Sequence, residues 1–481
     1  MPLPWIVVLL PWAGAVALAL VPRQRAAALA NIAVSAATLV PALLLLGHPH
    51  GELGPLRVDP LNAPLVALSA LVGLTTAVFS GGQLPAERLD ALRGRAYHAA
   101  FQLFMGAQAL ALLSDNLGIM WVAIEMATLS SVLMVALHGS PAAIEAAWKF
   151  FILCGVGIAL ALFGTIVLHL AAQPLAGHGD PGLSWAALRA VAAGCDPGLL
   201  NLAFVFLLVG YGTKAGLAPL HSWLPDAEAE GPIAISAVLS GLLLNAALVA
   251  VLRAVAVVRA NPEALPPGPF LVALGLASVL LASLALWRRR DARRFFAWSS
   301  IEHMGLAAFA FGLGGAAANL AGLLHMAGHS VVKSAIFFGV GHAARLKGGQ
   351  KLADVGGLAA THPALGWGLA VAVAAVAGLP PFVLFASEFL LLTETAARAW
   401  WLLPPLGLGL FAATAAKVAV LQGMCLGDPT PDVPEGRRPG RAAALSALVP
   451  LWLHLALALA IGLALPSAVA GMLEAAAEML G

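Results

Sequence analysis

The chain has 481 residues, of which 61% are hydrophobic and 10% charged, and its mean hydropathy is +0.93. Soluble domains carry about 25% charged residues, so this composition excludes a water-soluble protein and indicates a multi-pass membrane protein. The formal net charge of +2 does not indicate nucleic-acid binding. The three cysteines are isolated, which excludes an iron–sulfur, zinc-ribbon or disulfide framework. No GxGxxG or P-loop motif is present, and we expect no cofactor.

Apolar segments long enough to cross about 30 Å of hydrocarbon recur along the whole chain. The first one has no basic residue before it and two arginines after it, which favours a retained helix over a cleaved signal peptide. We predict an all-α polytopic membrane protein with about fourteen transmembrane helices, at 3–21, 26–47, 62–81, 97–114, 116–138, 143–170, 200–219, 232–258, 268–287, 292–314, 316–344, 365–395, 400–425 and 442–465.

The basic residues are distributed unevenly between the two sets of loops. Loops that follow odd-numbered spans carry sixteen of the 25, namely Arg23, Arg25, Arg88, Arg93, Arg95, Arg288, Arg289, Arg290, Arg293, Arg294, Arg345, Lys347, Lys351, Arg437, Arg438 and Arg441. The opposite loops and their edges carry five, namely Arg57, Arg189, Arg253, Arg259 and Arg398. Because cytoplasmic loops are enriched in lysine and arginine, we expect the first set to face the cytoplasm and both termini to face outward.

The four remaining basic residues all lie inside predicted spans and all are lysines: Lys149, Lys214, Lys333 and Lys417. A desolvated lysine can release its proton, whereas arginine remains charged. Two carboxylates, Glu125 and Glu388, also fall in mid-span. Each charge at the bilayer centre costs about 2.5–3.5 kcal/mol, which favours a functional role. This pattern predicts a proton pathway.

Structural alternatives exist for each of these charges. Glu125, Lys214 and Glu388 could instead form buried ion pairs that only fix helix packing. Lys149 follows Glu145 by four positions, the spacing of an ordinary helix pair near a membrane edge. Lys417 lies nearer a helix end, where its ammonium could reach the surface or serve as a proton entrance or exit.

Two Gly/Pro-interrupted segments match each other. AGLAPL at 215–220 agrees with AGLPPF at 377–382 in four of six positions, and they belong to spans seven and twelve. Because these spans are five apart, the copies run in opposite directions, which predicts inverted repeats of spans 4–8 and 9–13. The chain then divides into 1–95, 96–260, 261–427 and 428–481. The breaks fall at Gly216, Pro219, Gly378, Pro380 and Pro381, and we expect each to open a hydrated cavity.

A titratable stripe occupies span eleven. His325, His329 and Lys333 are spaced four residues apart, so they lie along one helix face and form a candidate proton wire. Two histidines at this spacing could also bind zinc, but no glutamate lies between them as in HExxH, and we expect no metal. Glu302 and His303 are placed at the cytoplasmic start of span ten, as a proton entrance or a surface pair.

The segments GYGTKAGLAPLHSWLPDAEAEGPIAISAVLSGLLLN, SSIEHMGL and LLHMAGHSVVKSAIFFGVGH resemble the antiporter-like membrane subunits shared by complex I, Mrp antiporters and group 4 [NiFe] hydrogenases. Within this family the chain is most similar to the hydrogenase-4 branch. The resemblance implies fourteen core helices, inverted five-helix repeats with broken helices seven and twelve, and a hydrated polar axis. Glu125 and Lys214 would be its fifth- and seventh-helix pair, Glu388 its twelfth-helix site, and the histidine–lysine stripe its eleventh-helix ladder.

One departure concerns the eighth helix, where many members of the family carry Lys or His. Here Ser240 and Asn245 occupy the segment, so the link between the two half-channels is in doubt. Both can hydrogen-bond but cannot carry a proton in the way lysine does. His221 would be a partial substitute.

The resemblance implies a non-catalytic, proton-translocating subunit of a multisubunit redox complex of hydrogenase or formate hydrogenlyase type in the inner (plasma) membrane. Redox chemistry would belong to peripheral [NiFe] and iron–sulfur partner subunits, next to other membrane subunits in the lipid bilayer. The alternatives are a subunit of an Mrp-type Na⁺/H⁺ antiporter or of complex I (NADH-quinone oxidoreductase), and a membrane scaffold.

Overall fold

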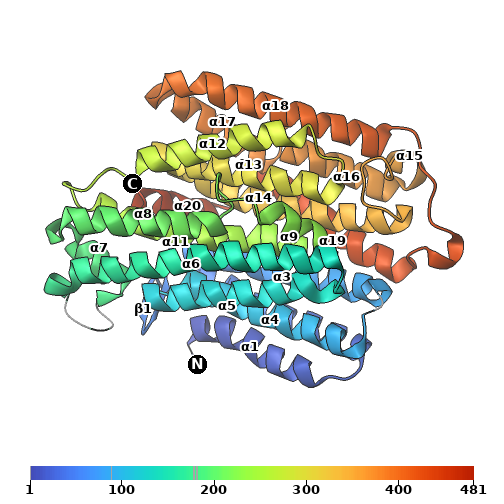
Figure 1. Ribbon diagram of the computed structural model, residues 1–481, viewed down its shortest axis with the longest axis horizontal. Helices are drawn as coiled ribbons and strands as arrows, with labels where there is room; N and C mark the ends of the chain where they lie inside the picture. The colour runs from blue at the N-terminus through green and yellow to red at the C-terminus, as the bar shows by residue number, and fades with distance from the viewer. Residues whose placement is uncertain (1, 88, 177–178, 180–181) are drawn as a thin grey trace.

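The computed structural model describes the whole chain except residues 1, 88, 177–178 and 180–181, so Arg88 lies outside the described residues. Its helices run side by side in one bundle, with α1 at one edge and α18 at the other (Figure 1). Within the described part, twelve helices are long and apolar enough to cross a membrane. The prediction of an all-α polytopic membrane protein is confirmed, with fourteen spans as an approximate count.

The N-terminal part contains α1 (Leu3–Leu20), α2 (Gln24–Leu44) and α3 (Asn62–Gln83). A short antiparallel hairpin, β1 (Gly51–Leu53) and β2 (Leu56–Val58), connects α2 to α3. Asn62 fixes the start of α3 because its amide donates to the carbonyls of Arg57 and Leu112 at 2.8 and 3.1 Å. The hairpin was not predicted from the sequence.

The next group of elements contains spans four to eight. It comprises α4 (Ala91–Leu113), α5 (Leu117–Val135), α6 (Pro141–Ala176), the short α7 (Trp185–Val191), α8 (Pro197–Lys214), α9 (Leu224–Glu230), α10 (Ile233–Val238) and α11 (Leu244–Arg259). Asp90, Asn116 and Asp196 cap the starts of α4, α5 and α8 by accepting backbone N–H bonds. A π-helical turn at Leu239–Leu243 joins α10 to α11, so span eight is irregular at its centre.

The last group contains α12 (Gly268–Leu286), α13 (Ala292–Leu313), α14 (Ala316–Lys347), α15 (Leu358–Thr361), α16 (Pro363–Val376), α17 (Val383–Arg398), α18 (Leu403–Leu421), α19 (Arg441–Leu463) and α20 (Ser467–Met479). α14 passes through the middle of the bundle and contacts α3, α10, α13, α16, α17, α19 and α20 (Figure 1). This central helix carries the histidine–lysine stripe. The terminal helix α20 was not among the predicted elements.

Both predicted helix breaks are present. α8 ends at Lys214 and α9 begins at Leu224, whereas α16 ends at Val376 and α17 begins at Val383. Gly216 has φ +73° and Gly378 has φ +71°, a left-handed conformation that other residues adopt only with strain. The matching glycines therefore turn the chain in the same way at both breaks. The division into units at 96–260 and 261–427 stays a prediction.

The loops that follow odd-numbered spans meet at one end of the bundle. Lys347 pairs with Asp432 at 2.8 Å, and Arg345 donates to the Gln83 carbonyl at 2.9 Å. Asp291 bridges to Lys351 by backbone pairing. The segments that carry most of the basic residues thus form one continuous surface. We refer to it as the basic end.

Arg253 differs from its predicted place at a loop edge. It lies within α11, is fully buried, and donates to the carbonyls of Leu112 at 3.0 Å and Ser114. Asp59 is 3.8 Å from its guanidinium. Arg253 therefore ties α11 to the end of α4 and to the start of α3, because a buried guanidinium must find carbonyl and carboxylate partners.

Candidate functional site

The first buried charge pair lies where α8 breaks. The ammonium of Lys214 is 3.6 Å from the Glu125 carboxylate on α5, and it also donates to Thr128 one turn further along that helix. The Lys214 side chain is fully buried, whereas that of Glu125 is 21% exposed. Lys214 is the last residue of α8, where the partial negative charge of a helix C-terminus stabilises a cation. The break thus gives the lysine an electrostatic partner in addition to Glu125.

Protein groups satisfy backbone carbonyls at this break. The indole N–H of Trp223 donates to the Thr213 carbonyl at 2.8 Å, and the Leu217 amide donates to the Gly212 carbonyl at 3.0 Å. Trp223 is itself buried and stacks on Phe150 with ring centroids 4.4 Å apart. Groups of the protein therefore satisfy these carbonyls at the break, and the hydrated cavity stays a prediction.

Lys149 does not join this pair. Its side chain is 46% exposed and bridges Glu145 at 2.7 Å and Asp226 at 3.0 Å. Arg294 contacts the same Asp226 at 3.1 Å, which makes a charge network at the basic end. The position of Lys149 agrees with the alternative interpretation, an ordinary i,i+4 pair near the membrane edge. The assignment of Lys149 to the interior lysines is therefore wrong.

The second buried pair lies beside the second break. Lys417 on α18 is 2.8 Å from the Glu302 carboxylate on α13, and both side chains are 1% exposed. The same ammonium donates at 3.0 Å to the carbonyl of Val376, the last residue of α16. Two expectations are therefore wrong: Lys417 does not reach the surface, and Glu302 does not lie at the cytoplasmic start of its helix.

The two breaks thus share one electrostatic arrangement. In each, a buried lysine has a carboxylate partner and lies near the C-terminus of a helix that ends at the break: Lys214 is the last residue of α8, and Lys417 donates to the carbonyl of the last residue of α16. At the first break the lysine belongs to the broken helix, and at the second Lys417 comes from α18. Thr414, also on α18, donates to the carbonyl of Ala377 at 3.2 Å, which adds a second hydrogen bond between α18 and the end of α16.

Histidines adjoin the second pair. His303 Nε2 lies 3.4 Å from the Lys417 ammonium, and His303 Nδ1 lies 2.9 Å from His325 Nε2 on α14. His325 Nδ1 in turn lies 2.9 Å from the Ser387 hydroxyl on α17. His329 packs with its ring centroid 5.6 Å from that of His303. These contacts form a continuous chain of titratable groups from Lys417 to α14.

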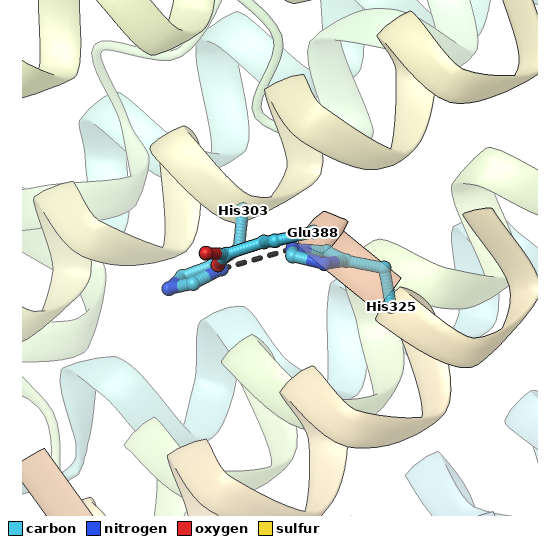
Figure 2. A group of neighbouring side chains, drawn as sticks. All are labelled: His303, His325 and Glu388. Atoms are coloured by element: carbon cyan, nitrogen blue, oxygen red, sulfur yellow. Dashed lines mark hydrogen bonds between the residues drawn. The ribbon is translucent and has the colours of Figure 1, made fainter. Parts of the chain in front are cut away.

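Glu388 completes this cluster. Its carboxylate and the ring nitrogens of His303 and His325 have ligating atoms within 4.8 Å of one another (Figure 2). Two histidines and a carboxylate are a donor set that could hold a divalent cation. In this structure, however, His303 and His325 face each other through a hydrogen bond, and the Lys417 ammonium lies next to His303. Both features suit a shared proton better than a metal ion.

Gly378 creates the space for the Glu388 carboxylate. A Cβ atom at this position would overlap a carboxylate oxygen of Glu388. Together with the positive φ, this close approach explains why glycine occupies the break. The break and the charge are therefore coupled by direct contact.

Lys333 occupies the far end of the stripe on α14. It is fully buried, donates to the Phe296 carbonyl at 2.5 Å, and lies 5.6 Å from the centroid of the Phe296 ring. His329, one turn before it, has two buried ring nitrogens without a hydrogen-bond partner in the part of the chain that the structure describes. These two groups continue the titratable chain from the cluster toward the basic end.

The polar residues of span eight bridge the two halves of the bundle. Ser240 and Ser300 share a hydrogen bond of 2.7 Å. This bond connects span eight to α13 at a position two residues before Glu302. Asn245 donates to the Ser330 hydroxyl at 2.7 Å, next to His329 on α14. His221 instead packs edge-on against Trp298, with ring centroids 5.0 Å apart. The described contacts do not connect His221 with Lys214, Ser240 or Asn245.

Glu228 is a functional candidate that the sequence did not reveal. It lies on α9, is fully buried, and neither carboxylate oxygen has a hydrogen-bond partner among the residues described. Burial raises the pKa of Glu228 well above its usual value, whereas the charges of Lys333 and Arg293 act in the opposite direction. Its neighbours Asp226 and Glu230 both pair with Arg294 at the surface, so only the packing of α9 distinguishes Glu228.

We expect replacement of Glu228 by glutamine to change how stability depends on pH. Because the folded chain holds the Glu228 proton more tightly than the unfolded chain does, this group stabilises the fold most at low pH. That contribution is lost as the pH rises from about 4.3 through the pKa in the folded state. Thermal unfolding in detergent at several pH values should show a smaller decline for Glu228→Gln. Replacing Glu474, which is exposed on α20, should leave the decline unchanged.

Comparison with known proteins identifies relatives along most of the chain. Residues 114–415 match the family described as NADH:quinone oxidoreductase/Mrp antiporter, TM. A hydrogenase-4 component F homolog from Methylacidiphilum infernorum is 47% identical over 466 residues, which cover 96% of each chain.

Two solved structures have the same fold. A chain of the membrane-bound sulfane sulfur reductase, an archaeal respiratory membrane complex, aligns with a TM-score of 0.85 and 22% identity, over 99% of this chain and 97% of that chain. A chain of the Mrp complex from a Dietzia species aligns with a TM-score of 0.84 and 21% identity, over 100% of this chain and 97% of that chain. The sequence match and the buried charge pairs lead to one conclusion: this multi-pass membrane protein belongs to the family of antiporter-like NADH:quinone oxidoreductase and Mrp membrane subunits.

Proposed function

We propose that this chain moves protons across the membrane along the axis formed by Glu125, Lys214, the Ser240–Asn245 bridge, the histidine cluster and Lys417. The observation that supports this most strongly is that two buried lysines, Lys214 and Lys417, each pair with a carboxylate beside a helix break. Each lysine can be protonated while its partner is charged, and each can release the proton when that partner is neutralised. Glu228 and Lys333 would connect the axis to the basic end, and Glu388 would be the terminal carboxylate at the second break.

Partners, orientation and location follow from this proposal. The chain would work inside a multisubunit respiratory complex of hydrogenase-4 or formate hydrogenlyase type, in the inner membrane. Its basic end would face the cytoplasm and both termini the outer side. Because the axis carries no redox group, [NiFe] and iron–sulfur subunits of the complex would supply the electrochemical work. A change in the charge or position of the Glu125 carboxylate, which is partly exposed on the side of the bundle, would alter how tightly Lys214 holds its proton. The redox reaction would in this way drive proton release from Lys214.

An Mrp-type Na⁺/H⁺ antiporter subunit is the second candidate, favoured by the fold shared with the Mrp complex. Na⁺ prefers carboxylate and carbonyl oxygens, whereas the second half of the axis is rich in nitrogen donors. Measuring proton movement in vesicles with and without Na⁺ separates the two. Transport that persists without Na⁺ supports the proton-only mechanism.

Replacing Lys214 by methionine tests the proposal. We expect proton translocation by inverted membrane vesicles that contain the whole complex to fall to background, because the first buried proton carrier is lost. The amount of assembled complex should remain near normal, since Glu125 is partly exposed and tolerates the loss.

Lys149→Met provides the matched control. It removes a lysine from the same half of the chain, but one that is 46% exposed and lies at the basic end. An exposed pair contributes about 0–1 kcal/mol, so this variant should keep both assembly and transport. Undiminished transport by Lys214→Met would contradict the proposed axis.

A further inference from the structure

Two adjoining cavities lie beside α19 at the basic end. The first is an apolar groove of about 570 Å³ between α2, α3 and α19, lined by side chains that include Leu29, Ile32, Val78 and Leu445. Among the described lining residues, its one polar side chain other than Arg25 is Ser446, whose hydroxyl donates to the Ala443 carbonyl at 2.9 Å. α2, α3 and α19 are all candidate membrane spans, and the lining residues belong to the ends of these helices at the basic end.

The second cavity has the opposite character. It measures about 760 Å³ and is lined by three arginines, Arg345, Arg437 and Arg438, together with backbone-rich Gly and Pro segments. The two cavities share Gly82 and Pro85 as lining residues, so they adjoin each other. An apolar groove therefore lies next to a basic chamber at the same end of the bundle.

The arginines of the chamber have unused hydrogen-bonding capacity. Arg437 has no ion-pair partner within the residues that the structure covers. Arg438 donates to the Val433 carbonyl at 3.2 Å and lies 3.6 Å from Asp432, a carboxylate that it shares with Lys347 at 2.8 Å. Arg345 uses one nitrogen on Gln83. The chamber thus keeps a net positive charge that an anionic group would neutralise.

We propose that the two cavities bind one anionic phospholipid, with an acyl chain in the groove and the phosphate among the three arginines. Basic pockets between helices on the cytoplasmic side favour anionic headgroups in this way. The apolar groove requires a hydrocarbon occupant, and the chamber requires a negative charge at its end. A phospholipid supplies both in a single molecule, whereas an apolar helix of a partner subunit would leave the arginines without a counter-charge.

The test uses the full chain purified in neutral detergent and titrated with phosphatidylglycerol or phosphatidylcholine of the same acyl chains, with bound lipid counted by native mass spectrometry. We expect tighter binding of phosphatidylglycerol. Each arginine near a membrane surface contributes about 1 kcal/mol, so Arg437→Gln/Arg438→Gln should weaken phosphatidylglycerol binding about 30-fold and leave phosphatidylcholine unchanged. Val449→Trp, which fills the groove, should weaken both lipids.

Arg288→Gln/Arg290→Gln is the matched control, since both side chains are exposed at the same end and line neither cavity. This variant should bind phosphatidylglycerol as the wild type does. Free glycerol phosphate should not displace the lipid, because it has no acyl chain. Equal affinity of the wild type for both lipids, or full retention by the double variant, would overturn the proposal. Another subunit seated in the groove of the purified complex would do so as well.

Discussion

Replacing Lys417 by methionine is expected to abolish proton translocation and to destabilise the fold more than any other lysine substitution in the axis. Glu302 would lose its only salt-bridge partner among the residues described while remaining 1% exposed. Removing one partner of a buried pair costs about 3–5 kcal/mol because the other charge is left uncompensated. The carbonyl of Val376 at the end of α16 would also lose its donor. Thermal unfolding in detergent and proton uptake by vesicles measure the two effects.

A double variant separates the two consequences. Lys417→Met/Glu302→Gln removes both charges, so most of the lost stability should return while transport stays absent. Recovery of transport along with stability would show that the pair only holds helices together, as the scaffold alternative requires. A Lys417→Met variant as stable as wild type would contradict the buried pairing itself.

Replacing Gly378 by alanine is expected to give the second large effect. A residue with a side chain in this left-handed conformation costs about 1–3 kcal/mol. The added methyl group would also displace the Glu388 carboxylate from His303 and His325. We therefore expect transport per folded molecule to fall strongly, in vesicles where the amount of assembled complex is quantified in parallel.

Gly216→Ala is the matched control at the first break. Gly216 has the same sign of φ, but the nearest atom to an added methyl group is a Leu224 side-chain carbon at 3.0 Å. This substitution should therefore reproduce the backbone penalty without moving a carboxylate. If both variants lose transport to the same degree, backbone strain alone accounts for the effect and the Glu388 contact does not matter.

The sequence was sufficient for the fold and for singling out both members of the first charge pair, whereas their pairing is what the family resemblance implied. Lys214 and Glu125 stand out because each is a charge within an apolar run, and the Gly–Pro break marks the position of the lysine. The repeated AGL motif likewise locates both breaks. These features depend on neighbouring residues along the chain, so local patterns reveal them.

The second pair could not be assigned in this way. Glu302 and Lys417 are 115 positions apart, and their contact joins α13 to α18 beside the end of α16. Glu302 lies next to His303 in an apparently polar segment, which suggests a surface position although α13 continues for eleven residues beyond it. The sequence does not single out Glu228 for a similar reason. It is one of three acidic residues in a short segment, and the segment does not show which carboxylate faces the interior.

The helix ends at the two breaks have a consequence for the energy of charge separation. A helix C-terminus carries roughly half an elementary negative charge that does not depend on pH. When a carboxylate takes up a proton or turns away, the lysine beside it retains this fixed counterion. The energy of the unpaired ammonium is therefore limited, and a positive charge can remain for a time in the low-dielectric interior without its mobile partner. The C-termini of the broken helices thus supply a fixed partial negative charge, which stabilises the lysine ammonium each time it is separated from its carboxylate partner.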